Sequence, residues 1–543
     1  MTAAPDVPTP AAPSPEAGFP LHRALPYFVA SALLALSQGL GQGFVTANVA
    51  QYAGDLGITT TEASWLLAAY LVPRASITLI LIKIRTQYGL RRFAEIGTAL
   101  YLAVAFASVW INDLRSAVVL QFLAGIASAP LSTLGFLYML EPLPQQWKMR
   151  LGLPMVLVLL MSAPTLARVI SPALVGDGGL EGIHLTTLAL AMLSLVAVRL
   201  LPLRPVPHMK VIQPLDLLSF ALIAFAFGGI ATGFVMGPIH WWGDTAWIGW
   251  LLAGSVAALA LTVVIELHRP EPLLDIRWLV SPAMLHLTAT LFLFRLLLSE
   301  QSTGAPRMFQ ALGLAPSQMT GLFAVICLAS LIGGLACVAW MKPGREPQFH
   351  LVALLLIAIG AFMDSHATVD TRPAQMIVSQ SLIGFAGMLF MPPAMLKGLM
   401  AALARGPNYL LSFVVVFLSS QSLGGVIGSG LFTTIINRRQ AFHYQGLAEQ
   451  LQATDPGTMR SIAGGMAALA GQMPDAAARR LQAVSALAQD AAAQAYVMAY
   501  NDAYFLTFLC AAGAAGLLLL HLLRDRLAAR LTPPSPSDIQ TAS

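Results

Sequence analysis

Long apolar runs divide this chain at regular intervals, and the short stretches between them hold most of the charged residues. Each run is about twenty residues long, which lets an α-helix cross a bilayer core of roughly 30 Å. The pattern therefore predicts fourteen membrane-spanning helices in an all-α integral membrane protein. They are expected at residues 24–52, 62–84, 93–112, 116–140, 152–175, 183–203, 215–237, 246–266, 282–300, 318–341, 349–364, 375–396, 409–436 and 498–523.

The composition supports this prediction. Of 543 residues, 57% are hydrophobic and only 10% are charged, whereas a soluble domain carries about 25% charged residues. The net charge of +5 does not indicate a nucleic-acid partner, because the basic residues are spread over short loops instead of one face. The cysteines lie within apolar runs without metal-ligand spacing, so neither a metal site nor a cofactor is expected.

The distribution of lysine and arginine predicts the orientation. Most of them fall in alternate loops, which the positive-inside rule assigns to the cytoplasm together with both termini. The expected organisation is a disordered cytoplasmic tail (1–22), a six-helix bundle (23–204), a linker with two inserted helices (205–281), a second six-helix bundle (282–525) and a cytoplasmic tail (526–543). The outer loop 438–496 belongs to the second bundle. Helical spacing after Pro474-Asp475 predicts helices there, either as a solvated connector or as a docking surface.

Three arginines lie within apolar runs: Arg74, Arg168 and Arg295. Ionisable groups at such depth usually mark a substrate or ion pathway, and the alternative is an arginine satisfied by backbone carbonyls. Glu95, Glu266, Glu300 and Asp364 are expected near the ends of their spans, which leaves the arginines without acids at their own depth. A planar guanidinium binds a carboxylate through two hydrogen bonds, so the pattern favours an anionic substrate.

Enzyme signatures such as GxxxxGK[ST], HExxH and GxSxG are absent from the sequence. Glycine and proline recur inside the spans, notably at Pro164, Pro172 and the Gly424-Gly425 pair, and such residues favour close helix packing and bending. A short basic hairpin follows the second span. It comprises Lys83, Arg85, Gly89, Arg91 and Arg92.

These motifs resemble the major facilitator superfamily, and specifically its fourteen-span drug:proton antiporters of the EmrB/QacA type. The basic hairpin stands where that superfamily has Gly-x-x-x-Asp-Arg-x-Gly-Arg-Arg. ELHRPEPLLDIRW (266–278) and SQSLGGVIGSGLFTTIINR (420–438) are similar to family segments. The resemblance covers about residues 24–525. It implies two six-helix bundles that alternate access to a central cavity, and a periplasmic adaptor as partner.

The chain departs from the family pattern at its coupling residues. The first span usually carries an acid five positions before an asparagine, but here Gly43 precedes Asn48. The fourth span usually carries an arginine four positions before a glycine, but here Gln121 precedes Gly125. We therefore assign Asn48 and Gln121 to the substrate site with the three buried arginines, and the basic hairpin to gating. Glu95 becomes the candidate for proton coupling.

The sequence thus predicts a bacterial inner-membrane efflux transporter for small amphipathic compounds, with organic anions favoured. Its expected partners are protons, a membrane-fusion adaptor in the periplasm and, through it, an outer-membrane channel. The main alternative is an importer or metabolite exchanger on the same scaffold. A membrane enzyme or a receptor is a more remote one.

Overall fold

The computed structural model describes residues 18–176, 179–204, 209–342, 344–452 and 454–531, and these residues form helices without a β-strand. Thirteen helices are long and apolar enough to span a membrane, and the bent pair α3–α4 makes a fourteenth span. The all-helical prediction is confirmed. Within the predicted tails, residues 1–17 and 532–543 lie outside the described residues. Residues 18–22 are ordered, because Phe19 N–H donates to Pro142 O at 2.9 Å and α1 begins at Leu21.

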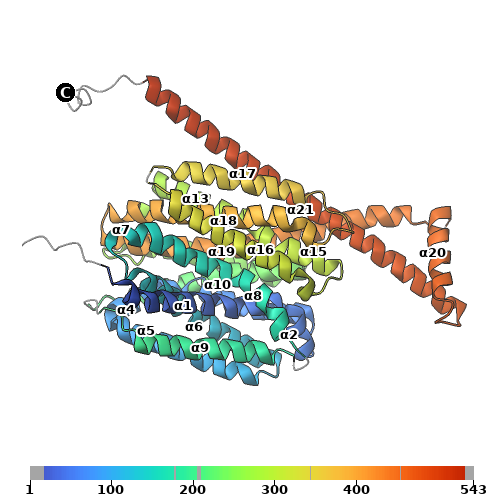
Figure 1. Cartoon of the computed structure of the whole chain (residues 1–543), viewed down its shortest axis with the longest axis horizontal. Coiled ribbons are helices and arrows are strands. Elements are labelled where there is room, and N and C mark those ends of the chain that lie inside the picture. Colours follow the sequence, from blue (N-terminus) through green and yellow to red (C-terminus); the bar gives the residue numbers. More distant parts are fainter. Residues whose placement is uncertain (1–17, 177–178, 205–208, 343, 453, 532–543) are drawn as a thin grey trace, which may run out of the picture.

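The first bundle packs α1 against α6, α8 and α9, and α3 against α6. It occupies the lower, blue-to-teal part of Figure 1. Its helices are α1 (Leu21–Ala47), α2 (Val49–Asp55), α3 (Thr60–Arg74), α4 (Ile77–Tyr88), α5 (Leu90–Ala107), α6 (Leu114–Leu140), α7 (Gln145–Trp147), α8 (Leu153–Leu174) and α9 (Glu181–Leu200).

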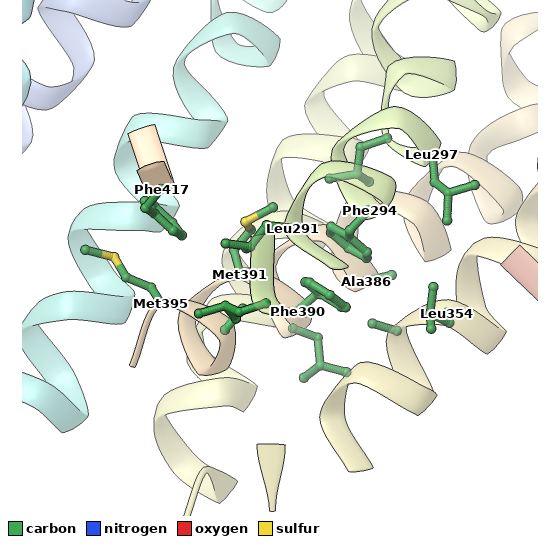
Figure 2. Close-up of a cluster of buried hydrophobic side chains, with 14 of the residues drawn as sticks. Leu291, Phe294, Leu297, Leu354, Ala386, Phe390, Met391, Met395 and Phe417 are labelled. Carbon is green, nitrogen blue, oxygen red and sulfur yellow. The ribbon is translucent and has the colours of Figure 1, made fainter. Parts of the chain in front are cut away.

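The second bundle lies above it in Figure 1, in yellow to red. Its core is a set of apolar side chains from several helices (Figure 2), in which Phe294 and Phe390 stack with ring centroids 3.6 Å apart. Its helices are α12 (Ile276–Leu279), α13 (Pro282–Leu297), α14 (Ser299–Thr303), α15 (Ala305–Ala311), α16 (Thr320–Trp340), α17 (Glu346–Asp364), α18 (Ile377–Leu403), α19 (Pro407–Gln450), α20 (Pro456–Ala468) and α21 (Ala476–Leu531).

The two inserted helices, α10 (Pro214–His240) and α11 (Ala246–His268), pack on each other, and α10 contacts both bundles. Small residues allow this close approach. A Cβ on Gly228 would lie 2.8 Å from Val72 of α3, and one on Gly430 of α19 would lie 2.4 Å from the carbonyl oxygen of Phe234. Helix α10 therefore fills the space between α3 and α19.

Three spans that the sequence predicts as continuous are broken. Asn48 separates α1 from α2, and α3 meets α4 at an angle of 42° just beyond Pro73 and Arg74. The span predicted at 282–300 continues through α14 and α15 to Ala311. The prediction that Glu300 lies near the end of that span is therefore wrong. The polar stretch Ser299–Thr303 resembles a loop in the sequence, but in the structure it is a helical segment with buried side chains.

The end of α19, α20 and the start of α21 form a helical hairpin that projects beyond the bundles (Figure 1). Asp475 caps α21 by accepting hydrogen bonds from the N–H groups of Ala477 and Ala478, at 3.0 and 3.2 Å. The predicted helix after Pro474-Asp475 is thus confirmed. Both ends of the described chain lie at the opposite end of the molecule from this hairpin (Figure 1).

Candidate functional site

Arg74 is the last residue of α3 and is held at the bend before α4. Its Nη2 donates to Gln38 Oε1 of α1 at 2.9 Å and to Ser132 Oγ of α6 at 2.6 Å. Ser132 in turn donates to Gln38 Oε1 at 3.1 Å. All these partners are neutral, so the positive charge of Arg74 stays uncompensated inside the first bundle. Helix α6 approaches α3 closely one turn before Arg74, since a Cβ on Gly125 would lie 2.3 Å from Tyr70 O.

A small cavity of about 50 Å³, lined by both polar and apolar side chains, lies within the first bundle. Gln38 lines it, so one side chain connects the cavity with Arg74. The predicted site residue Gln121 also lines it. The other polar residues of the lining are Gln42, Tyr52, Tyr70, Tyr101, Ser108, Ser128, His184 and Thr187. A cavity of this size has room for a water molecule beside its polar side chains.

Arg168 of α8 reaches across to the second bundle. Its Nη2 donates to the carbonyl oxygen of Ser302 in α14 at 2.9 Å, and its guanidinium lies 5.2 Å from the ring centroid of Phe323 in α16. Within the part of the chain that the structure describes, neither Arg74 nor Arg168 forms an ion pair with a carboxylate. Both guanidiniums therefore keep their attraction for an anion.

Arg295 and Asn48 are engaged differently. The guanidinium of Arg295 lies across Gly424 and Gly425 of α19, and its Nε donates to Gln421 O at 3.2 Å. Asn48 is buried, and its amide donates to Phe44 O at 2.7 Å and to Ser171 Oγ at 2.5 Å. These contacts join helices, and the structure does not bring these two side chains into the group around Arg74.

The basic hairpin connects α4 to α5 through Gly89, whose φ of +86° favours glycine. Arg91 and Arg92 are exposed, and Arg91 Nε pairs with Glu95 Oε1 at 3.1 Å on the surface of α5. Arg85 is half-buried. Glu95, the candidate for proton coupling, is therefore bound to a hairpin residue and lies apart from the Arg74 group.

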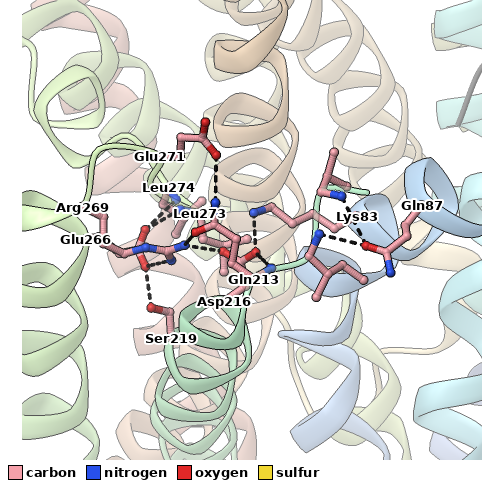
Figure 3. Close-up of polar contacts among 12 residues, drawn as sticks. Lys83, Gln87, Gln213, Asp216, Ser219, Glu266, Arg269, Glu271, Leu273 and Leu274 are labelled. Carbon is pink, nitrogen blue, oxygen red and sulfur yellow. Dashed lines mark hydrogen bonds and ion pairs between the residues drawn. The ribbon is translucent and has the colours of Figure 1, made fainter. Parts of the chain in front are cut away.

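Lys83 belongs to a buried ionic network that sequence reasoning missed (Figure 3). Its Nζ donates to Asp216 Oδ2 at 2.7 Å, and Arg269 donates to Asp216 Oδ1 at 2.8 Å and to Glu266 Oε1 at 2.9 Å. Glu266 also accepts from Ser219 and from the N–H of Leu273, at 2.5 Å for the latter. Since the side chains of Asp216 and Glu266 are fully buried, the network anchors α10 and α11 to α4.

A second acidic group was also missed. Glu300 of α14, Asp364 at the end of α17 and Gln380 of α18 are 0, 2 and 0% exposed. The Nε2 of Gln380 donates to Asp364 Oδ2 at 2.7 Å and to Glu300 Oε1 at 3.4 Å. The sequence places Glu300 at the end of its span, whereas the helical segment α14 carries it to a fully buried position in the second bundle.

No family model matches the sequence. The chain is 26% identical over 325 residues to the uncharacterized MFS-type transporter YhcA of Bacillus subtilis. This match covers 57% of the chain and 58% of YhcA, which is less than two thirds of the length of YhcA. It is 22% identical over 510 residues to the multidrug export protein EmrB of Haemophilus influenzae, covering 91% of this chain and 94% of EmrB.

Among solved structures, the fold is similar to that of the major facilitator superfamily proton:xylose symporter XylE from E. coli, with a TM-score of 0.51 and 13% identity over 77% of this chain and 90% of XylE. The chain is thus a multi-pass membrane protein with the fold of the major facilitator superfamily, and the proteins that it resembles are transporters. Within that superfamily it fits the fourteen-span EmrB/QacA type, which confirms the resemblance predicted from the sequence.

Proposed function

We propose that this chain is a secondary active exporter in a bacterial inner membrane, driven by protons, and that it favours small amphipathic organic anions such as aromatic carboxylates. The observation that carries the proposal is the pair Arg74 and Arg168, two guanidiniums inside the bundles whose partners are all neutral. A negative substrate group supplies the charge that the protein does not. Export as the direction is supported by the similarity to the multidrug export protein EmrB.

The substrate's negative group binds at Arg74 or Arg168, while Gln38 and Gln121 contact its polar part from the adjoining cavity. The apolar part lies against the span residues around them. The basic hairpin gates the cytoplasmic side, and Lys83 joins this gate to the inserted helices. Asn48 and Arg295 support this site by holding α1 to α8 and α13 to α19.

The projecting hairpin is the docking surface for a periplasmic adaptor, which continues the path to an outer-membrane channel. Its helices expose large apolar side chains to solvent, among them Phe442, Met459 and Leu481, which are 63, 51 and 74% exposed. Exposed apolar residues on a protruding element are typical of protein–protein contacts. Cysteine crosslinking from position 481 in cells that also express a candidate adaptor tests this contact, and recovery of the exporter alone would contradict it.

The anion preference is tested in everted membrane vesicles with 1-naphthoate and a size-matched aromatic cation. Arg74→Gln and Arg168→Gln should each raise the half-saturating naphthoate concentration about 10- to 100-fold, since a hydrogen bond to a charged group contributes about 1.5–3 kcal/mol. Arg74→Lys should retain part of the affinity. The exposed Arg115→Gln serves as the matched control. Faster transport of the cation, or unchanged naphthoate uptake in both glutamine variants, would contradict the proposal.

A further inference from the structure

The buried group of Glu300, Gln380 and Asp364 joins three elements of the second bundle. Glu300 lies in α14, at the break of its span, Asp364 ends α17, and Gln380 lies one turn into α18. None is more than 2% exposed. The transport proposal leaves this group without a role, although two buried carboxyl groups are costly to keep unless their charge is compensated.

The hydrogen bonds within the group leave it short of donors. Gln380 supplies its two N–H bonds to Asp364 and Glu300, and the hydroxyl of Ser379 donates to Asp364 Oδ1. Two buried acceptor atoms, Glu300 Oε2 and Gln380 Oε1, have no hydrogen-bond partner. Buried acceptors are almost always satisfied, so the missing donor is itself an observation. One added proton on the acid pair supplies a donor and removes one of the two negative charges.

The surrounding elements provide no compensating cation among the described residues. Helix α21 contributes the buried Tyr504, whose ring lies near Gly304 and whose hydroxyl faces Met308 Sδ, and α19 contributes Gly428, which lies near Ser299. Arg307 of α15 donates to Thr433 of α19 at 3.0 Å. The other charged groups nearby are bonded elsewhere: Arg168 to Ser302 O, Arg295 to Gln421 O, and the exposed His366 to Phe362 O.

The network of Figure 3 is the internal comparison. Asp216 and Glu266 are as deeply buried, but Arg269 pairs with both and Lys83 pairs with Asp216. The same chain thus contains one buried acid pair neutralised by cations and one that is not. No group of three or more metal-ligating side chains occurs in the described ranges, so the uncompensated pair lacks a donor set for a divalent ion. A proton is the ligand that fits it.

We propose that Glu300 and Asp364 form a shared proton-binding site that couples transport to the proton gradient, with Gln380 as the residue that positions both carboxyl groups. The inference rests on the proposed proton-driven export, and it moves coupling from Glu95 to the second bundle. The proposed proton site lies close in sequence to a contact of the proposed substrate-binding residue Arg168. Ser302, two residues after Glu300, is the residue whose carbonyl binds Arg168 across the bundle interface. Helix α14 therefore joins Glu300 to the residue that Arg168 contacts.

The first test measures protonation without any transport. Dicyclohexylcarbodiimide reacts with protonated carboxyl groups in apolar surroundings, and mass spectrometry of the purified full chain locates the adduct. Labelling is expected at Glu300 or Asp364, falling at least tenfold between pH 6 and pH 9, with Asp216 and Glu266 unlabelled. The exposed Asp370→Asn should leave it unchanged. Labelling confined to other acids, or protection by sodium ions at constant pH, would overturn the proposal.

The second test measures coupling in proteoliposomes with 1-naphthoate. In Glu300→Gln and Asp364→Asn, the ratio of pH-driven accumulation to counterflow, which needs no net proton movement, should fall at least tenfold. The Asp370→Asn ratio should match the wild type. An unchanged ratio, or loss of both activities together in a protein that keeps its thermal unfolding midpoint, would overturn the proton site. Labelling at Glu300 without pH-driven accumulation in the wild type would instead refute proton-driven export.

Discussion

Arg269→Ala is the most direct test of the buried network that anchors the inserted helices (Figure 3). The substitution removes the only cation that touches both Asp216 and Glu266 among the described residues. It deletes the bonds of 2.8 and 2.9 Å to these carboxylates and a weaker one of 3.2 Å to Gln213 Oε1. Arg269 is itself only 5% exposed at its side chain, so solvent cannot replace it without opening the loop.

The expected loss of stability follows from the hydrogen-bond partners that the two carboxylates keep after the substitution. Asp216 keeps Lys83 and the N–H of Gln213, whereas Glu266 keeps only Ser219 and two backbone N–H groups. Removing one partner from a buried ion pair costs about 3–5 kcal/mol. A structural unit of roughly 200 residues loses about 2–4 °C per kcal/mol, so the unfolding midpoint should fall by about 6–20 °C.

The assay is thermal unfolding of the detergent-purified chain, followed by the fluorescence of its nine tryptophans. Lys83→Ala should cost less, about 1.5–3 kcal/mol, because it removes a single charged hydrogen bond. Arg277→Ala is the matched control, since Arg277 lies eight residues further on, in the short helix α12, and is exposed. In a Glu266→Gln background, Arg269→Ala should cost less than in the wild type. A midpoint for Arg269→Ala equal to that of Arg277→Ala would refute the reasoning.

Two backbone positions give further predictions. Gly125→Val should prevent accumulation of folded protein in the membrane, because a Cβ at this position would lie 2.3 Å from Tyr70 O. Gly54→Val is the control, since a Cβ at Gly54 meets no atom within 4 Å. Equal yields of the two variants would contradict the prediction. Gly89→Ala should lower stability by about 1–3 kcal/mol, since its φ of +86° is strained for alanine. An unchanged unfolding midpoint would show that the hairpin adapts.

Hydropathy predicted the fold well because spanning helices have to be apolar over a fixed length. The breaks within the spans are less visible in the sequence. The 42° bend between α3 and α4 follows Pro73, in a region where Gly125 of α6 lies against Tyr70. Such a contact joins residues far apart in the chain, which a local pattern does not reveal.

The residues of the candidate site are only partly predictable from the sequence, because their contacts also join residues that are far apart in the chain. A lone arginine in an apolar run is visible in the sequence, and Arg74 and Arg168 are both placed inside the bundles with neutral partners. Lys83 looked like a gating residue, yet its partner Asp216 is 133 residues away. Glu300 was missed because the polar residues around it lower the local hydropathy. The signal that could have found it is the helix-compatible sequence that continues through Pro306 to Ala311.

Helix α21 is a single helix of 56 residues that starts in the projecting hairpin and ends at Leu531. At 1.5 Å per residue it is about 84 Å long, more than twice the thickness of a bilayer core. A continuous helix of this kind is stiff along its length, and its middle section includes the buried Tyr500 and Tyr504. Any tilt of α21 would therefore move the tip of the hairpin further than it moves the part of the helix that packs in the second bundle.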